Sequence, residues 1–331
     1  MNDLSRLFAP DDARDALRNL GGLLVGVGLF TTFFRKSDPA LGDTWGNWGL
    51  FAVLAIAFVF LYGIGMLARR ITAVSRAWQA VYIVFGILLA PLVLFQFVDA
   101  VNGTPGASLN VFWIFLATLG LATAAALFGG VRFGLLLASL AAIVSWSALW
   151  NKILSNGLAS HYGIYRGLLL ILAALLVASA YALWQADRGG RLRAIRGVQG
   201  EPELARSRAS EIVTGAAVAA VIAGSLSLTR AFEAPFISPP SAGSSLLWEI
   251  VLLIVSLLAL GYGGSFGTRG TAYVGGFGLL FFAIIAGADV NDSTPAGSIV
   301  GWPLVLVILG GAAFAASLVP KGPRYWRGDR A

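Results

Sequence analysis

The chain lacks the residues on which several kinds of functional site depend. Its 331 residues include no cysteine and a single histidine, His161. Disulfides, thiolate metal sites, cysteine nucleophiles and histidine metal clusters are therefore excluded. The sequence also contains no phosphate-binding loop and no strand-turn-helix dinucleotide fingerprint. We expect a protein that is not an enzyme and that holds no cofactor and no metal.

Charged residues are scarce, at 12% of the chain against about 25% in soluble proteins. Hydrophobic residues make up 58%, and the mean hydropathy is +0.81. Because the apolar runs are continuous rather than alternating, they favour membrane helices of about 20 residues over a β-barrel. The predicted fold is an all-α polytopic membrane protein with about ten transmembrane helices. The predicted spans are 18–34, 47–67, 77–98, 109–129, 133–150, 164–186, 211–229, 245–262, 271–288 and 299–318.

No acidic or basic residue and no histidine lies near the middle of any predicted span. Proton relays and ion pathways place such costly groups there, so a proton-coupled pump is disfavoured. A pathway for an uncharged solute is still compatible with the sequence. Pro91 and Pro303 could free backbone carbonyls inside two of the spans.

Basic residues indicate the orientation of the chain, because short cytoplasmic loops retain Lys and Arg. With the N-terminus inside, only Arg35, Lys36, Lys152, Arg166 and Arg230 fall on the outer side. Both termini are therefore predicted to be cytoplasmic. The net charge of +7 is then a product of topology and does not indicate a nucleic-acid partner. The many arginines of this Ala- and Gly-rich chain are typical of GC-rich coding, so we expect the cytoplasmic membrane of a bacterium.

The longest polar segment is the predicted cytoplasmic loop 187–210, which is rich in arginine. One interpretation is that these charges only hold the topology. The other is that they contact anionic lipid headgroups, since each basic residue near the surface contributes about 1 kcal/mol. The arginines concerned are Arg188, Arg191, Arg193, Arg196, Arg206 and Arg208.

A polar phrase occurs twice, as Val-Asn-Gly-Thr-Pro at 101–105 and Val-Asn-Asp-Ser-Thr-Pro at 290–295. Similar residues precede both copies, which predicts repeated helical hairpins with one orientation in the membrane. The hairpins are expected to pair the first span with the second, the third with the fourth, and so on. The predicted parts are a cytoplasmic interfacial lead-in (1–17), a first membrane repeat (18–130), a central hairpin (131–186), the basic loop (187–210), a second membrane repeat (211–318) and a basic tail (319–331).

Small residues at helical spacing predict close helix packing, which in lipid replaces hydrophobic attraction between helices. Gly22 and Gly26 show this spacing, as do Gly130 and Gly134. Further glycines cluster at 263–264, 275–278 and 310–311.

Acidic residues gather on the predicted outer side. Asp99 and Asp289 stand at related places just before the repeated phrase. They could accept hydrogen bonds from the loops that follow them, as in Asx-type turns. Alternatively, Asp99, Glu249, Asp289 and Asp292 form a polar or cation site at the outer mouth. Glu249, about one turn into its span, needs a partner, for which Arg230 and Arg166 are the candidates.

These features support two functions. The first is a non-catalytic integral membrane subunit or scaffold, which packs with partner membrane proteins or with itself. It is favoured by the charge-free spans, the short loops and the absence of a catalytic grouping. The alternative is a permease for an uncharged or weakly polar solute with an acidic periplasmic mouth. An outer-face transferase, which would use acidic loop residues, is the minor remaining reading.

Overall fold

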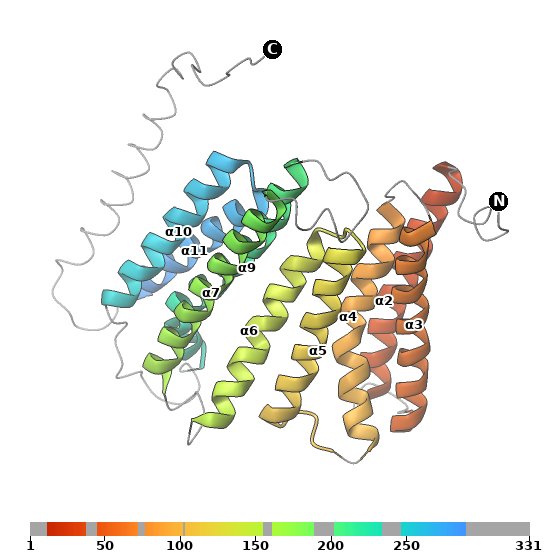
Figure 1. Ribbon diagram of the computed structural model, residues 1–331. Coiled ribbons are helices and arrows are strands. Elements are labelled where there is room, and N and C mark those ends of the chain that lie inside the picture. The colour runs from red at the N-terminus through yellow and green to blue at the C-terminus, as the bar shows by residue number, and fades with distance from the viewer. Residues whose placement is uncertain are drawn as a thin grey trace, which may run out of the picture.

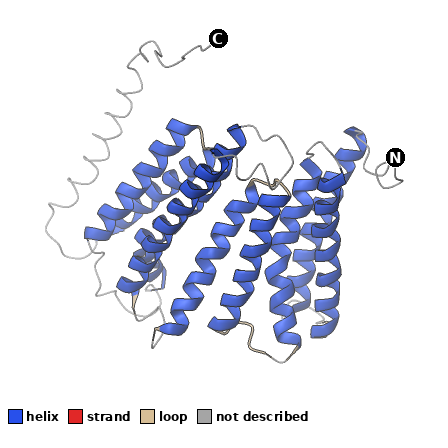
Figure 2. Cartoon of the chain, viewed as in Figure 1, coloured by secondary structure: helices blue, strands red, loops and turns tan. Residues whose placement is uncertain are grey.

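The computed structural model describes residues 12–37, 45–71, 77–101, 103–154, 161–188, 202–233 and 246–288. Regular structure in these ranges is entirely helical (Figure 2). Eight of the helices are long and apolar enough to cross a membrane, so the predicted all-α polytopic membrane fold is confirmed. The helices are α2 (Asp12–Ser37), α3 (Asn47–Ile71), α4 (Ala77–Ala100), α5 (Ser108–Phe128), α6 (Phe133–Ile153), α7 (Tyr162–Arg188), α9 (Pro202–Glu233), α10 (Leu246–Phe266) and α11 (Arg269–Ala288).

The first nine predicted spans each correspond to one of these helices, and the tenth, 299–318, lies outside the described residues. Two helices extend well beyond their apolar spans. Residues 12–17 of the predicted lead-in belong to α2, and residues 202–210 of the predicted loop belong to α9. Hydropathy marks the part of a helix inside the lipid, whereas backbone hydrogen bonding continues into polar turns outside it.

The two ends of the helical bundle differ in charge. At one end, α3, α5 and α7 finish and α4, α6 and α9 begin. We call this the arginine-rich end, because Arg69, Arg70, Arg132, Arg208 and Arg269 lie there. The other end, at which α4 leads into α5, is called the opposite end. In Figure 1 the arginine-rich end is at the top.

The most extensive helix packing joins α3 with α4, α5 with α6, α7 with α9, and α10 with α11. These pairs are offset by one helix from the expected hairpins, in which α2 would pair with α3 and α4 with α5. Glycines admit a partner helix in several of the pairs, and Gly134 of α6 does so against Ala122 of α5. Gly65 and Gly86 admit the partner helix in the α3–α4 pair, and Gly263 and Gly275 do so in the α10–α11 pair. Close backbone approach of this kind supplies packing in lipid.

The two halves of the chain share a packing pattern. In the first half, α2 packs against α4, the partner of α3. In the second half, α9 packs against α11, the partner of α10. The first helix of each predicted repeat thus lies against the third. α9 also packs against α6 and α7 and so joins the two halves.

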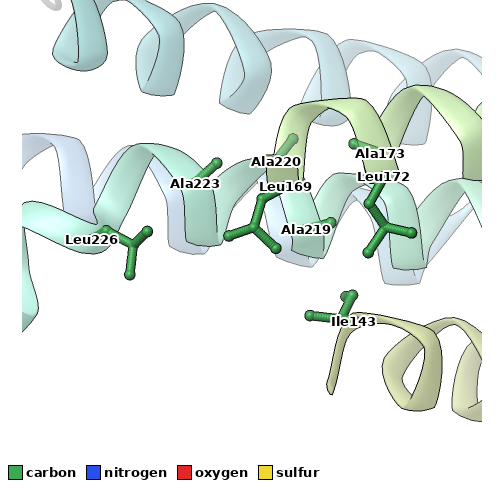
Figure 3. Packing of buried hydrophobic residues seen from close by; sticks show 8 residues of the cluster. All are labelled: Ile143, Leu169, Leu172, Ala173, Ala219, Ala220, Ala223 and Leu226. Atoms are coloured by element: carbon green, nitrogen blue, oxygen red, sulfur yellow. The ribbon is translucent and has the colours of Figure 1, made fainter. Parts of the chain in front are cut away.

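A cluster of small and branched residues forms the contact of α9 with α6 and α7 (Figure 3). Alanines from α9 form one cluster with Leu169 and Leu172 of α7 and Ile143 of α6. Because alanine side chains are short, the helix axes can approach closely. The span within α9 is accordingly the most buried of the eight candidate spans.

Large apolar side chains cover much of the outer surface of the bundle. Ile56, Val59 and Phe60 of α3 are exposed, and so are Leu258 of α10 and Phe277 of α11. A soluble protein rarely exposes apolar surface of this extent. On a membrane protein, this surface faces the lipid.

Candidate functional site

Two of the four acidic residues predicted to line the outer mouth are described, Asp99 and Glu249. Asp99 is half-buried in the last turn of α4. Glu249 is only 5% exposed and lies in the first turn of α10. Asp289 and Asp292 lie outside the described residues.

The structure does not bring Asp99 and Glu249 together. α4 belongs to the first half of the bundle and α10 to the second, and α6, α7 and α9 lie between them in Figure 1. The two carboxylates therefore have separate surroundings at the opposite end.

The loop after Asp99 is closed mainly by backbone groups. The Gly103 N–H donates to the Val98 carbonyl at 2.8 Å, which satisfies a carbonyl of the last turn of α4. The Asn110 side-chain amide donates to the Thr104 carbonyl at 2.8 Å. The described part of this loop thus uses backbone carbonyls, where the sequence suggested an Asx-type turn on the Asp99 carboxylate. Asn102 lies outside the described residues.

Around Glu249, the structure places a second buried charge. Arg166 of α7 is 9% exposed, and its guanidinium carbon lies 5.1 Å from the ring centroid of Trp248, the residue before Glu249. Arg166 was one of the two predicted partners, and the structure places its guanidinium against Trp248, at the start of the helix that carries Glu249. For Arg230, the other candidate, no side-chain position is described.

Helix dipoles explain why Arg166 needs such surroundings. It lies one turn from the N-terminus of α7, where the helix dipole disfavours a positive charge. The negative charge of Glu249, near the N-terminus of α10, interacts favourably with the dipole of its helix. A guanidinium stays protonated in proteins. The face of Trp248 offsets part of this cost through a cation–π contact.

Hydrogen bonds hold the neighbouring aromatic residues in place. Trp146 of α6 donates its indole N–H to the Leu168 carbonyl of α7 at 3.0 Å. The hydroxyls of Ser147 and Tyr165 lie 2.8 Å apart. The start of α7 is therefore fixed against the end of α6, which positions Arg166 for its contact with α10.

Buried hydroxyl groups inside the spans mostly bond to their own helices. Ser139 donates to the Leu135 carbonyl at 2.9 Å, and Ser256 donates to the Leu252 carbonyl at 2.6 Å. Each also faces a glycine of another helix, Gly215 and Gly278 respectively. These hydroxyls therefore lie in helix contacts and do not line an open path.

The six arginines predicted to contact lipid headgroups are only partly described. Arg191, Arg193 and Arg196 lie outside the described residues, and the side chains of Arg188 and Arg206 are not described. Arg208 lies in α9 and is 5% exposed. Sequence reasoning placed it in a surface loop because hydropathy gives no sign that the helix begins at Pro202.

Residues 263–267 have the Gly-x-Ser-x-Gly spacing of a hydrolase nucleophile motif. That motif works at a sharp turn from a strand into a helix. Here Ser265 lies in the last turns of α10, next to Gly267 with its positive φ of 70°. The structural context that a nucleophile requires is thus missing. Within the described ranges, His, Asp and Glu form no group of three that could hold a metal ion.

Comparison with known proteins identifies the fold. No family model and no curated protein matches the sequence. Among solved structures, a chain of the "MycP5-free ESX-5 inner membrane complex, State II" has a similar fold, with a TM-score of 0.58 and 18% sequence identity. The similarity covers 96% of this chain and 74% of that one.

Proposed function

We propose that this chain is a non-catalytic integral membrane subunit, or scaffold, which packs with partner membrane proteins in a bacterial cytoplasmic membrane. The proposal rests on how the polar groups inside the spans are hydrogen-bonded and packed. A solute pathway needs polar groups that face a common space. Ser139 and Ser256 instead bond to their own helices and pack against glycines.

Another buried pair of hydroxyls supports the same conclusion. Thr214 of α9 and Thr271 of α11 are both buried, and their hydroxyl oxygens lie 2.8 Å apart. The Thr214 hydroxyl also donates to the Ser210 carbonyl of its own helix at 2.9 Å. Interhelical bonds of this kind hold helices together in lipid.

The structural comparison favours a subunit as well. The solved chain of similar fold comes from a preparation described as an inner membrane complex. A fold that is built into an assembly there is suitable for the same use here. The predicted cytoplasmic positions of both termini are part of this proposal.

Purification in a mild detergent followed by native mass spectrometry tests the proposal. We expect the tagged chain to carry a second membrane protein in fixed stoichiometry. An unrelated polytopic protein with the same tag, purified from the same host, should lack that partner.

Two results would contradict the subunit role. One is a solitary chain after purification in several mild detergents. The other is flux of an uncharged solute into vesicles that contain only this chain, with a loss of flux in Asp99→Asn. That second result would establish the permease in its place.

A further inference from the structure

The turn between α5 and α6, at the arginine-rich end, is built around two glycines. A Cβ on Gly129 would lie 2.6 Å from the Ala125 carbonyl oxygen and 2.9 Å from Met66 Sδ of α3. Gly130 has a φ of 65°, in the left-handed region that favours glycine. The turn therefore sits directly against the last turns of α3.

Arg69 of α3 lies along this turn. Its Nη1 is 3.6 Å from the position that a Cβ on Gly130 would take. The side chain is half-buried, and its Nε is enclosed with no hydrogen-bond partner among the described residues. A guanidinium has five N–H donors and keeps its charge, so Arg69 brings a positive charge to the turn that no described carboxylate neutralises.

Arg132 brings a second positive charge to the same turn. It directly precedes α6, is exposed, and makes no side-chain cap for that helix. The Gly134 and Leu135 N–H groups donate to the Val131 and Arg132 carbonyls instead, so the start of α6 contributes the positive end of its helix dipole, which favours anions. The positive charge of Arg132 also attracts the Glu211 carboxylate of α9.

α9 approaches this turn with Arg208 as well. Ile212 of α9 packs in one cluster with Ala126 of α5 and Leu135 of α6. Arg208 precedes Ile212 by four residues, so the two share a face of the helix. The buried Arg208 is thus on the side of α9 that meets α5 and α6. Glu211 is half-buried on this helix and offsets only part of the positive charge.

We propose that Arg69 and Arg132 bind the phosphate group of an anionic phospholipid, with Arg208 and the dipole at the start of α6 adding to the positive field. Arginine suits phosphate because its planar fork donates two parallel hydrogen bonds. The site lies at a helix end, the depth at which headgroups meet a membrane protein. Its parts come from α3 of the first predicted repeat, α6 of the central hairpin and α9 of the second repeat, so a bound headgroup connects all three. The site does not depend on the subunit role.

Native mass spectrometry of the full chain in detergent tests the site, with phosphatidylglycerol and phosphatidylcholine of identical acyl chains as probes. We expect preferential retention of phosphatidylglycerol. Arg69→Gln and Arg132→Gln should each lower this retention by about fivefold. Arg70→Gln removes the same charge from the exposed neighbour of Arg69 and should leave retention within about twofold.

The size-exclusion profile and the far-UV circular dichroism spectrum check that each variant is folded. If Arg69→Gln does not fold, Arg69→Lys replaces it, since it keeps the charge but loses the fork and should still weaken retention. Equal retention of the two lipids, or an equal loss in Arg70→Gln and Arg69→Gln, would overturn the proposal.

Inorganic phosphate distinguishes the two sources of the phosphate group. We expect millimolar phosphate to leave phosphatidylglycerol bound, because the acyl chains add to its affinity. Displacement of the lipid by phosphate alone would overturn the lipid as ligand and assign the site to a free phosphate.

Discussion

Gly275 and Gly276 are neighbours in α11 with opposite surroundings, which allows a matched test of the helix packing. A Cβ on Gly275 would lie 2.5 Å from the backbone nitrogen of Leu260 and 2.7 Å from the Ser256 carbonyl oxygen, both in α10. A Cβ on Gly276 would meet nothing within 4 Å. Alanine at the first position therefore collides with a backbone that cannot rotate away, whereas alanine at the second does not.

The size of the effect follows from these distances. Non-bonded carbon atoms pack at about 3.5–4 Å, so Gly275→Ala requires α10 and α11 to separate by roughly 1 Å. A gap of that size loses about a quarter to a half of the dispersion energy of the atoms involved. Overpacking of this kind costs about 1–3 kcal/mol. Gly276→Ala should be neutral or stabilise by up to about 1 kcal/mol, because alanine favours the helix.

Thermal unfolding in detergent, followed by far-UV circular dichroism, measures the difference. We expect Gly275→Ala to melt several degrees below the native chain and Gly276→Ala at or above it. Equal melting temperatures for the two variants would refute the close α10–α11 contact. A loss in Gly276→Ala alone would show that α11 turns its other face to α10.

Two further predictions concern the orientation of the bundle and the contact of Arg166 with Trp248. A single cysteine at Thr104, the only thiol in the chain, should react with an impermeant maleimide from outside intact cells, while one at Ser265 should not; the reverse pattern would invert the topology. Trp248→Leu removes the ring beneath Arg166 and should lower stability by about 0.5–2 kcal/mol in a melting experiment. Trp113→Leu, at a ring that is 58% exposed, should change stability by less than about 0.5 kcal/mol, and an equal effect of the two would count against the cation–π contact.

The positions of several helices could be predicted closely from the sequence. The expected span 77–98 became α4 (Ala77–Ala100), and 109–129 became α5 (Ser108–Phe128). In these segments the apolar run ends where polar or glycine-containing loops begin, so hydropathy and backbone structure change together. In α9 they do not, because polar helical turns precede the apolar run.

Glycine spacing predicted close helix packing. It could not identify the partner helix or show which glycines serve in a turn. Gly22 and Gly26 do admit aromatic residues of another helix, Tyr82 and Phe85 of α4. Gly134 packs against Ala122 and Ala126 of α5, whereas Gly130, at the same spacing, takes a positive φ in the turn before α6. Spacing shows only that one face of a helix is narrow, and the neighbour is decided by tertiary packing.

The candidate sites show the same limit. The sequence could place Glu249 near the start of its helix and suggest Arg166 as a partner. It could not show that Trp248 lies beneath the Arg166 guanidinium, since α7 and α10 are separated by α9 along the chain. Likewise, Arg69 lies along the α5–α6 turn because Gly129 and Gly130 allow this turn to approach α3.

The shared packing of the two halves bears on where partner proteins would bind. α2 and α9 are the first helices of the two predicted repeats, and each packs against the third helix of its own half. α9 is also covered by α6 and α7, whereas α2 is the least buried of the eight candidate spans, with Leu20, Leu24 and Val27 exposed. If the repeats are equivalent, the exposed face of α2 corresponds to surface that the chain covers on α9 with its own helices. On the proposed subunit role, α2 is therefore the helix that partner membrane helices would cover, because the same type of helix already accepts two neighbours within this chain.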